Sequence, residues 1–88
     1  MNVDQASKII IKPYITEKTF AMVENESKIC FIVERSASKP EIADAVNTLY
    51  KEKVTNVNTA RTIYGTKAFV QFENIEKASD LATKIGML

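Results

Sequence analysis

The first half of the chain alternates short apolar runs with polar segments, which predicts a strand followed by a helix. Ile9 to Ile11 predicts a short strand. The strand should end at Lys12-Pro13, because proline has no backbone donor and favours extended geometry in the residue before it. Thr16 is a residue type that caps helices, and Phe20 and Val23 follow it with helical spacing. A helix beginning at Thr16 is therefore expected after the first strand.

The middle of the chain predicts a buried strand and an amphipathic helix. Lys28 to Glu34 is almost entirely apolar and rich in β-branched and aromatic residues, as in a central strand. Ser38 to Glu41 has the sequence of a capping box, and Pro40 is tolerated in the first turn of the helix that it begins. The apolar stripe of this helix should pack on the sheet and consists of Ile42, Ala45, Val46, Leu49 and Tyr50.

Two strands and a helix are expected in the C-terminal half. Val54 to Tyr64 and Lys67 to Glu73 are predicted to form a β-hairpin with a tight turn at Gly65-Thr66. Apolar residues are placed irregularly in the first of these strands, which indicates a β-bulge. Asn74 can cap a final helix, and Gly86 can end it.

The elements follow the order β-α-β-α-β-β-α, and the predicted fold class is α+β. Helices link the earlier strands and a hairpin joins the last two, so the sheet should be antiparallel with helices packed on it. The 88 residues are enough for one modest hydrophobic core and too few for two. Residues 1–88 are therefore expected to form a single domain, in which residues 1–8 can be a flexible N-terminal tail.

The inventory of reactive side chains argues against an enzyme. The chain has no histidine and one cysteine, which excludes Ser/His and Cys/His catalysis, an internal disulfide and cysteine-rich metal sites. There is no glycine-rich phosphate loop and no convergent pair of acids. Cys30, between Ile29 and Phe31, is expected to be a buried core thiol and not a reactive one. We therefore expect no catalytic residue, cofactor or bound metal.

Hydropathy also argues against a membrane protein. No apolar run approaches the roughly 20 residues that a membrane-spanning helix needs. The N-terminal residues 1–8 lack both the basic start and the apolar stretch of a secretory signal. We expect the protein to remain in the cytoplasm, without insertion into a membrane.

Charge is unevenly distributed along the chain, although the formal net charge is only +1. The segments Lys8 to Thr16 and Lys53 to Phe72 together contain five cationic residues and no acidic one, so the acids are confined to the rest of the chain. A bound phosphate responds to the nearby charges more than to the total charge. This distribution favours a nucleic-acid partner, although a solvated face that lacks acids would produce the same pattern.

The predicted hairpin carries side chains suited to RNA. Asn58 and Thr59 can hydrogen-bond sugar or base edges, or can simply form the polar outer face of a strand. Arg61 can bind a phosphate or stack on a base, and Lys67 adds a point charge. Tyr64 can stack on a base or pack across the hairpin. The predicted RNA-binding residues are Lys8, Lys12, Lys39, Lys53, Asn56, Asn58, Thr59, Arg61, Tyr64 and Lys67.

Four segments resemble, in the same order, the motifs of the L-twenty-three family of large-subunit ribosomal proteins. Lys12 to Lys18 resembles the opening motif of the family, and Ala37 to Ile42 resembles the start of its second helix. Val54 to Thr59 is similar to its most distinctive strand, and Gly65 to Ala68 is similar to the turn that follows. Bacterial members have a long basic loop at this turn. The short turn here resembles archaeal members, and the family's lysine pair after it is reduced to Lys67.

The resemblance implies a structural constituent of the large ribosomal subunit that binds large-subunit ribosomal RNA near the exit of the polypeptide tunnel. The implied partners also include neighbouring large-subunit ribosomal proteins of the L-twenty-nine type. Signal recognition particle or a chaperone would dock at an exposed surface around Thr16, Glu17 and Lys18. From the residues alone, an acid in the first turn of a helix needs no partner to explain it.

Two other classes of function remain open at this point. The chain can be a small α/β protein-interaction or ligand-sensing domain without RNA binding, since the hairpin leaves an edge strand that can pair with another chain. A hydrolase that uses lysine or carboxylate groups is the weaker alternative, because no constellation of such groups is evident.

Overall fold

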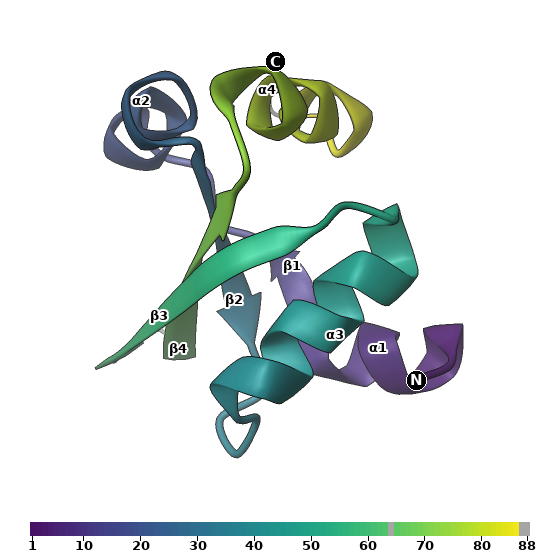
Figure 1. The fold of residues 1–88 in the computed structure, drawn as a ribbon. Helices are drawn as coiled ribbons and strands as arrows, with labels where there is room; N and C mark the ends of the chain where they lie inside the picture. The colour runs from purple at the N-terminus through teal and green to yellow at the C-terminus, as the bar shows by residue number, and fades with distance from the viewer. Residues whose placement is uncertain (64, 87–88) are drawn as a thin grey trace.

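The computed structural model describes residues 1–63 and 65–86. Its helices and strands follow one another along the chain as Figure 1 shows. They are α1 (Val3–Ile9), β1 (Ile10–Pro13), α2 (Glu17–Glu26), β2 (Lys28–Val33), α3 (Lys39–Tyr50), β3 (Val54–Thr62), β4 (Gly65–Phe72) and α4 (Ile75–Lys84). From β1 onward the predicted order β-α-β-α-β-β-α is confirmed. The fold is α+β and forms a single compact domain of 29 × 28 × 21 Å.

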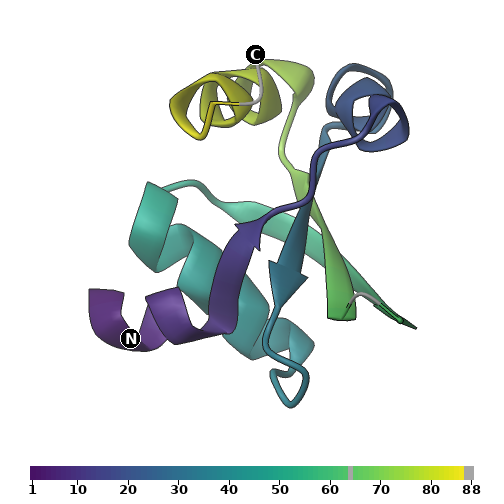
Figure 2. The same ribbon diagram turned by 180° about the vertical axis from the view of Figure 1, so that it is seen from behind.

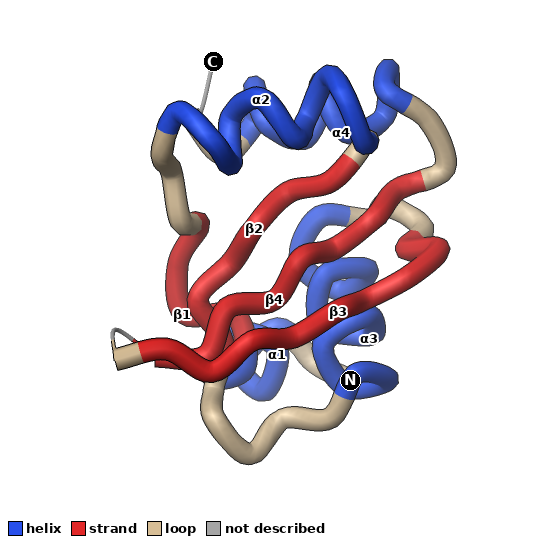
Figure 3. The backbone as a smooth tube through the Cα atoms, turned by 90° about the vertical axis from the view of Figure 1, so that its left-hand side faces the viewer, coloured by secondary structure: helices blue, strands red, loops and turns tan. Residues whose placement is uncertain are grey.

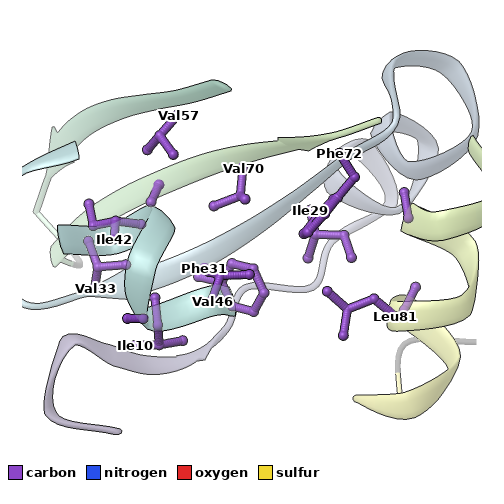
Figure 4. Packing of buried hydrophobic residues seen from close by; sticks show 14 of the residues in the cluster. Ile10, Ile29, Phe31, Val33, Ile42, Val46, Val57, Val70, Phe72 and Leu81 are labelled. Carbon is purple, nitrogen blue, oxygen red and sulfur yellow. The ribbon is translucent and has the colours of Figure 1, made fainter. Parts of the chain in front are cut away.

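The helices of the described chain pack against one face of the sheet. In Figure 2, α1 and α3 lie side by side against the sheet, while α2 and α4 lie together at one end of it. Side chains from all of these elements join one apolar cluster, shown in Figure 4, in which Leu81 of α4 lies beside Ile29 and Phe72. Phe31 and Val46 lie at the centre of the same cluster. A single core thus unites both pairs of helices with the sheet.

The strands form an antiparallel sheet in the order β1-β2-β4-β3. Figure 3 views this sheet from the face that no helix covers, with α1 and α3 behind it. The strand β2 is central, as its apolar sequence predicts, and Cys30 within it is buried as expected. The strands β1 and β3 form the two edges.

A helix occupies the segment for which the sequence analysis allowed a flexible tail. The helix α1 begins with a capping box: Asn2 Oδ1 accepts from the Gln5 backbone N–H at 2.8 Å, and Gln5 Oε1 accepts from the Asn2 N–H at 3.2 Å. Ala6 is fully buried where α1 packs against α3. The apolar pattern of these residues is too weak to predict a helix, because one alanine is the only residue of α1 that is completely buried.

Several strand boundaries differ from the prediction. Ile9, predicted to begin the first strand, belongs to α1, and β1 continues past Ile11 through Lys12 and Pro13. Proline is tolerated there because β1 is an edge strand. In the hairpin, β3 ends at Thr62, which pairs with Gly65 at the start of β4, so the turn predicted at Gly65-Thr66 is wrong. Gly65 has a φ of +123°, which glycine adopts easily, and belongs to β4 rather than to a turn.

The predicted caps and the predicted bulge are confirmed. The side chains of Thr16, Ser38 and Asn74 accept from backbone N–H groups at the starts of α2, α3 and α4. The register of β3 shifts between Val54 and Asn56, where Thr55 is the extra residue. The helices of the described residues include none that is long and apolar enough to cross a membrane.

Candidate nucleic-acid interface

The strand register shows which side chains share the uncovered face of the sheet. Directly paired residues of antiparallel strands point to the same face, and alternate residues along a strand do the same. Val70, Ala68 and their partners lie on the side of the sheet that faces the core, where all of them except the exposed Thr59 join the core cluster. The remaining positions define the open face: Lys12, Tyr14, Lys28, Cys30, Ile32, Asn56, Asn58, Ala60, Thr62, Gly65, Lys67, Phe69 and Gln71. Figure 3 shows the strands that carry it.

The open face is cationic and carries no acidic side chain. One of its lysines, Lys28, forms an ion pair of 3.6 Å with Glu26 at the end of α2. Lys12 and Lys67 form no ion pair within the described residues, and both lie directly opposite Ile32 in the register. The open face therefore presents two lysines free of acidic partners across its middle.

An aromatic ring holds one of these two lysines in place. The Lys67 Nζ atom lies 4.1 Å from the centroid of the Tyr14 ring. Tyr14 follows β1, and its backbone N–H donates to the Cys30 carbonyl at 2.9 Å. The contact attracts the ammonium group to the ring without neutralising its charge. Lys67 is half-buried and its charge is kept in a defined place on the face.

The centre of the open face is packed, although no helix covers it. Cys30 is 1% exposed and Ile32 is also buried, so the side chains of the adjacent strands cover them. Burial raises the pKa of the Cys30 thiol to about 11, against the opposing effect of the Lys67 charge. The thiol therefore stays protonated and unreactive.

Amide side chains line the outer part of the open face. Asn56 and Asn58 are exposed on the edge strand β3, and Gln71 is half-buried opposite Asn56 on β4. Each amide offers both donors and an acceptor. The combination of fixed cations and amides on rigid strands suits phosphates, 2′-hydroxyls and base edges.

The predicted RNA-binding residues do not all lie together. Four of them, Lys12, Asn56, Asn58 and Lys67, belong to the open face. Thr59 and Arg61 pair with Ala68 and Thr66, so they point toward the opposite side of the sheet from Asn58.

Three other predicted residues, Lys53, Lys8 and Lys39, lie away from the open face. Lys53 precedes β3, at the end of that strand far from Arg61. Lys8 and Lys39 are exposed on α1 and α3, which pack on the covered side. The sequence predicted that Lys39 and Lys12 form one patch. This prediction is wrong, because Lys39 lies on the covered side of the sheet and Lys12 on the open face. Tyr64 lies outside the described residues.

The residues expected to dock protein factors are close together at the start of α2. Thr16 caps the helix, and Glu17 and Lys18 are exposed in its first turn. A shallow hollow of about 370 Å³ is lined by Ile15, Thr16, Glu17 and Phe20. Ile15 and Phe20 both expose apolar surface there.

Comparison with known proteins shows the family to which this chain belongs. The family model described as ribosomal protein L23 matches residues 8–83. The protein is 45% identical over 80 residues to large ribosomal subunit protein uL23 of Methanobrevibacter smithii, which covers 90% of this chain and 93% of the relative. This chain belongs to the ribosomal protein L23 family.

Other relatives support the archaeal type. Large ribosomal subunit protein uL23 of Methanosphaera stadtmanae is 42% identical over 90% of this chain, and that of Pyrobaculum aerophilum is 44% identical over 84%. Each match covers 93% of the relative. These archaeal sources confirm the resemblance drawn from the short hairpin turn. The match begins at Lys8, so it includes every strand and leaves out most of α1.

Membership of the L23 family confirms several expectations about the class of protein. The protein is a structural component of the ribosome and not an enzyme, and it is located in the cytoplasmic ribosome. The protein is therefore part of a ribonucleoprotein, the large ribosomal subunit, and belongs to the machinery of translation.

Sequence reasoning missed several polar side chains of the open face. Tyr14, Lys28 and Gln71 were not among the predicted binding residues. Alternation along each strand could have found them, since Tyr14 follows Lys12 by two positions and Gln71 follows Lys67 by four. The pairing of β2 with β4, which are distant in sequence, was needed to bring them onto one face.

Proposed function

We propose that this member of the L23 family binds large-subunit ribosomal RNA through the open face and lies near the exit of the polypeptide tunnel. The observation that carries the proposal is the acid-free open face, on which Lys12 and Lys67 stand without acidic partners beside the exposed amides of Asn56 and Asn58. The name of the archaeal relatives, large ribosomal subunit protein, supports a place in the large subunit, and the tunnel exit is what the family resemblance implies.

The rigidity of the sheet makes this face suitable for a folded RNA. Folded RNA is recognised largely by shape and by contacts to phosphates and 2′-hydroxyls. A lysine whose backbone is fixed in a strand loses less conformational entropy when it binds a phosphate than a lysine on a mobile segment does. The ring of Tyr14 already restricts Lys67 before RNA arrives, so less entropy is lost on binding.

The salt dependence of RNA binding tests this proposal. We expect the affinity of the purified protein for large-subunit ribosomal RNA to fall steeply as salt rises, because released counterions drive phosphate binding. Lys12→Ala with Lys67→Ala should reduce the slope of log affinity against log salt by about 2, or about 1 for each lost phosphate contact. The matched control is the pair Lys51→Ala and Lys84→Ala, exposed lysines outside the open face.

The outcome of this comparison is decisive in either direction. An unchanged slope in the double variant of the open face, or an equal reduction in the control pair, would contradict binding through the open face. A flat salt response of the unmodified protein would contradict RNA binding altogether. Circular dichroism of each variant establishes that the fold is retained.

We further propose that nascent-chain factors, signal recognition particle or a chaperone, dock at the start of α2. The exposed apolar side chains of Ile15 and Phe20 beside the charge of Glu17 support this surface. Ribosomes carrying Glu17→Lys should bind such a factor more weakly than ribosomes carrying the control Glu24→Lys, which changes an exposed acid later in the same helix. Equal binding by both ribosomes would contradict this docking site.

A neighbouring protein of the L-twenty-nine type is proposed as a partner in the subunit. Zero-length crosslinking of intact large subunits tests this partner directly. A crosslink between the two proteins is expected, and crosslinks only to proteins of other types would contradict it.

A second candidate is strand pairing through β3. This nine-residue strand is the edge of the described sheet, and its outer hydrogen-bonding groups have no partner strand there. An exposed edge can pair with another chain. Sedimentation of the free protein distinguishes the two: a monomer that binds RNA supports the ribosomal proposal, while a dimer that ignores RNA supports strand pairing.

A further inference from the structure

A hollow lies at the end of the sheet where the paired residues Thr62 and Gly65 of β3 and β4 lie, and it extends beyond the open face. Its volume is about 530 Å³, within the range of small-ligand sites. Side chains from both edges of the sheet reach it, with Ile11 from β1 and Arg61 from β3. Arg35 reaches it from the loop between β2 and α3. Ile32 and the exposed pair Thr62 and Gly65 belong both to the hollow and to the open face, so the two surfaces adjoin.

Two arginines of the hollow have no acidic partner. Neither Arg35 nor Arg61 forms an ion pair within the described residues, and both side chains are exposed. The one acid of the hollow, Glu34, is engaged by Ser36: its carboxylate accepts from the Ser36 backbone N–H at 2.8 Å and from the Ser36 hydroxyl. These hydrogen bonds lower the pKa of Glu34, so its carboxylate stays charged and the hollow holds two arginines against one acid. The two arginines, on different elements, can each bind an anion through forked donors.

Apolar surface stands next to these cations. Ile63 is 92% exposed and Ile11 is 57% exposed, and both line the hollow. Ile11 is the residue displaced by the bulge in β1, between the paired residues Ile10 and Lys12. Packing of the core does not explain either side chain. Apolar walls beside guanidinium groups match a nucleotide, whose flat base sits next to a charged phosphate.

We propose that this hollow receives a single unpaired nucleotide of the RNA, with its base against Ile11 and Ile63 and its phosphate bound by Arg35 and Arg61. The inference rests on the proposed RNA binding and adds a specific subsite to it. A splayed-out nucleotide fits the observed arrangement because RNA unpaired in a bulge or loop exposes both the base face and the phosphate. Because the open face and the hollow have residues in common, RNA bound on the open face can extend into the hollow.

Chemical probing of the RNA tests the subsite. The full-length protein is bound to deproteinised large-subunit ribosomal RNA, and acylation of the 2′-hydroxyls is mapped along the RNA. We expect one unpaired nucleotide whose reactivity changes with the unmodified protein and returns to the free-RNA value with Arg35→Gln and Arg61→Gln combined. Protections elsewhere should persist in that variant. Lys84→Gln, exposed on α4, is the matched control and should keep every change.

Each other outcome has a distinct meaning. If the arginine variant keeps the full pattern, or loses all protections together, the single-nucleotide subsite is contradicted while RNA binding stands. If the unmodified protein protects no nucleotide, the proposed function itself fails. As a second measurement, p-benzoylphenylalanine in place of Ile63 should crosslink to one RNA nucleotide in assembled large subunits. Crosslinks to protein alone would assign the hollow to a peptide and overturn the proposal.

Discussion

Cys30 and Lys67 show how single residues acquire their properties from neighbours distant in sequence. Cys30 belongs to the face of the sheet without helices, and it is still buried because side chains of β1 and β4 flank it. Lys67 keeps its charge while the Tyr14 ring holds it. A residue on the open face can therefore be either inert or available to a ligand, depending on the side chains of the adjacent strands.

The Cys30 thiol should react slowly in the folded protein. With its pKa raised to about 11 by burial, only about one thiol in a thousand is ionised near pH 8. We expect the rate of labelling by a disulfide reagent to be much lower in the native protein than in denaturant, measured by absorbance. A native rate equal to that of the unfolded chain would contradict the burial of Cys30.

The capping carboxylate of Glu41 should make stability depend on pH. The Ser38 backbone N–H donates to this carboxylate at 2.9 Å, which lowers the pKa of Glu41 below its usual value of 4.5. A pKa lowered by folding stabilises the protein above the unfolded-state value, and this stabilisation is lost as the pH falls through the folded-state value.

Melting temperatures from about pH 6 to about pH 3 check this expectation. Glu41→Gln keeps an acceptor oxygen but carries no charge, so its melting temperature should fall less steeply in acid than that of the unmodified protein. Glu24→Gln, an exposed acid without such a bond among the described contacts, is the control. Identical slopes for Glu41→Gln and the unmodified protein would contradict the role of the charged cap.

Among the elements, the caps are local and the docking of helices is not. Ser38, Thr16 and Asn74 begin their helices because each side chain bonds to a backbone group three residues away. The pattern of nearby residues was sufficient to predict those helices. The helix α1 has a local capping box of Asn2 and Gln5, but its docking depends on the burial of Ala6 where α1 packs against α3, which joins segments far apart in sequence.

Ala6→Gln should destabilise the protein by about 1–3 kcal/mol, since a larger polar side chain does not fit where α1 packs on α3. Urea unfolding gives the difference in free energy. Ser7→Gln, the same substitution at an exposed neighbour in α1, should have little effect. Equal stability of both variants would mean that α1 does not dock in solution.

At the scale of the whole molecule, one core joins the two pairs of helices. Leu81 of α4, Phe31 of β2 and Ile42 of α3 belong to the same buried cluster, so no part of the sheet has a separate core. A domain of this size has a net stability of only about 5–15 kcal/mol. Loss of one large buried side chain should therefore affect the entire fold.

Leu81→Ala should cost about 2–5 kcal/mol, because it removes a completely buried side chain and leaves a cavity. Thermal unfolding followed by far-ultraviolet circular dichroism and by tyrosine fluorescence should remain a single coincident transition at a lower temperature. Asp80→Ala, exposed on the same helix, is the control. Two separate transitions would contradict a single shared core.

The candidate site could be predicted in part from the sequence. The acid-free stretch from Lys53 to Phe72 correctly located the two neighbouring strands β3 and β4, and alternation in β4 separated Lys67 from Val70. Asn58 and Thr59, adjacent in sequence, were grouped together, yet they point to opposite faces because side chains alternate along a strand. Lys39 was grouped with Lys12 before the side of the sheet covered by α3 was known.

Local chemistry along the chain was enough to establish the helix caps, the central apolar strand and the absence of histidine chemistry. Those features depend on residues a few positions apart or on composition. Only tertiary structure decided that β2 lies beside β4, that Tyr14 meets Lys67, and that Arg35 and Arg61 share one hollow. These contacts join segments far apart in sequence, and their geometry is set by strand register and by packing of the common core.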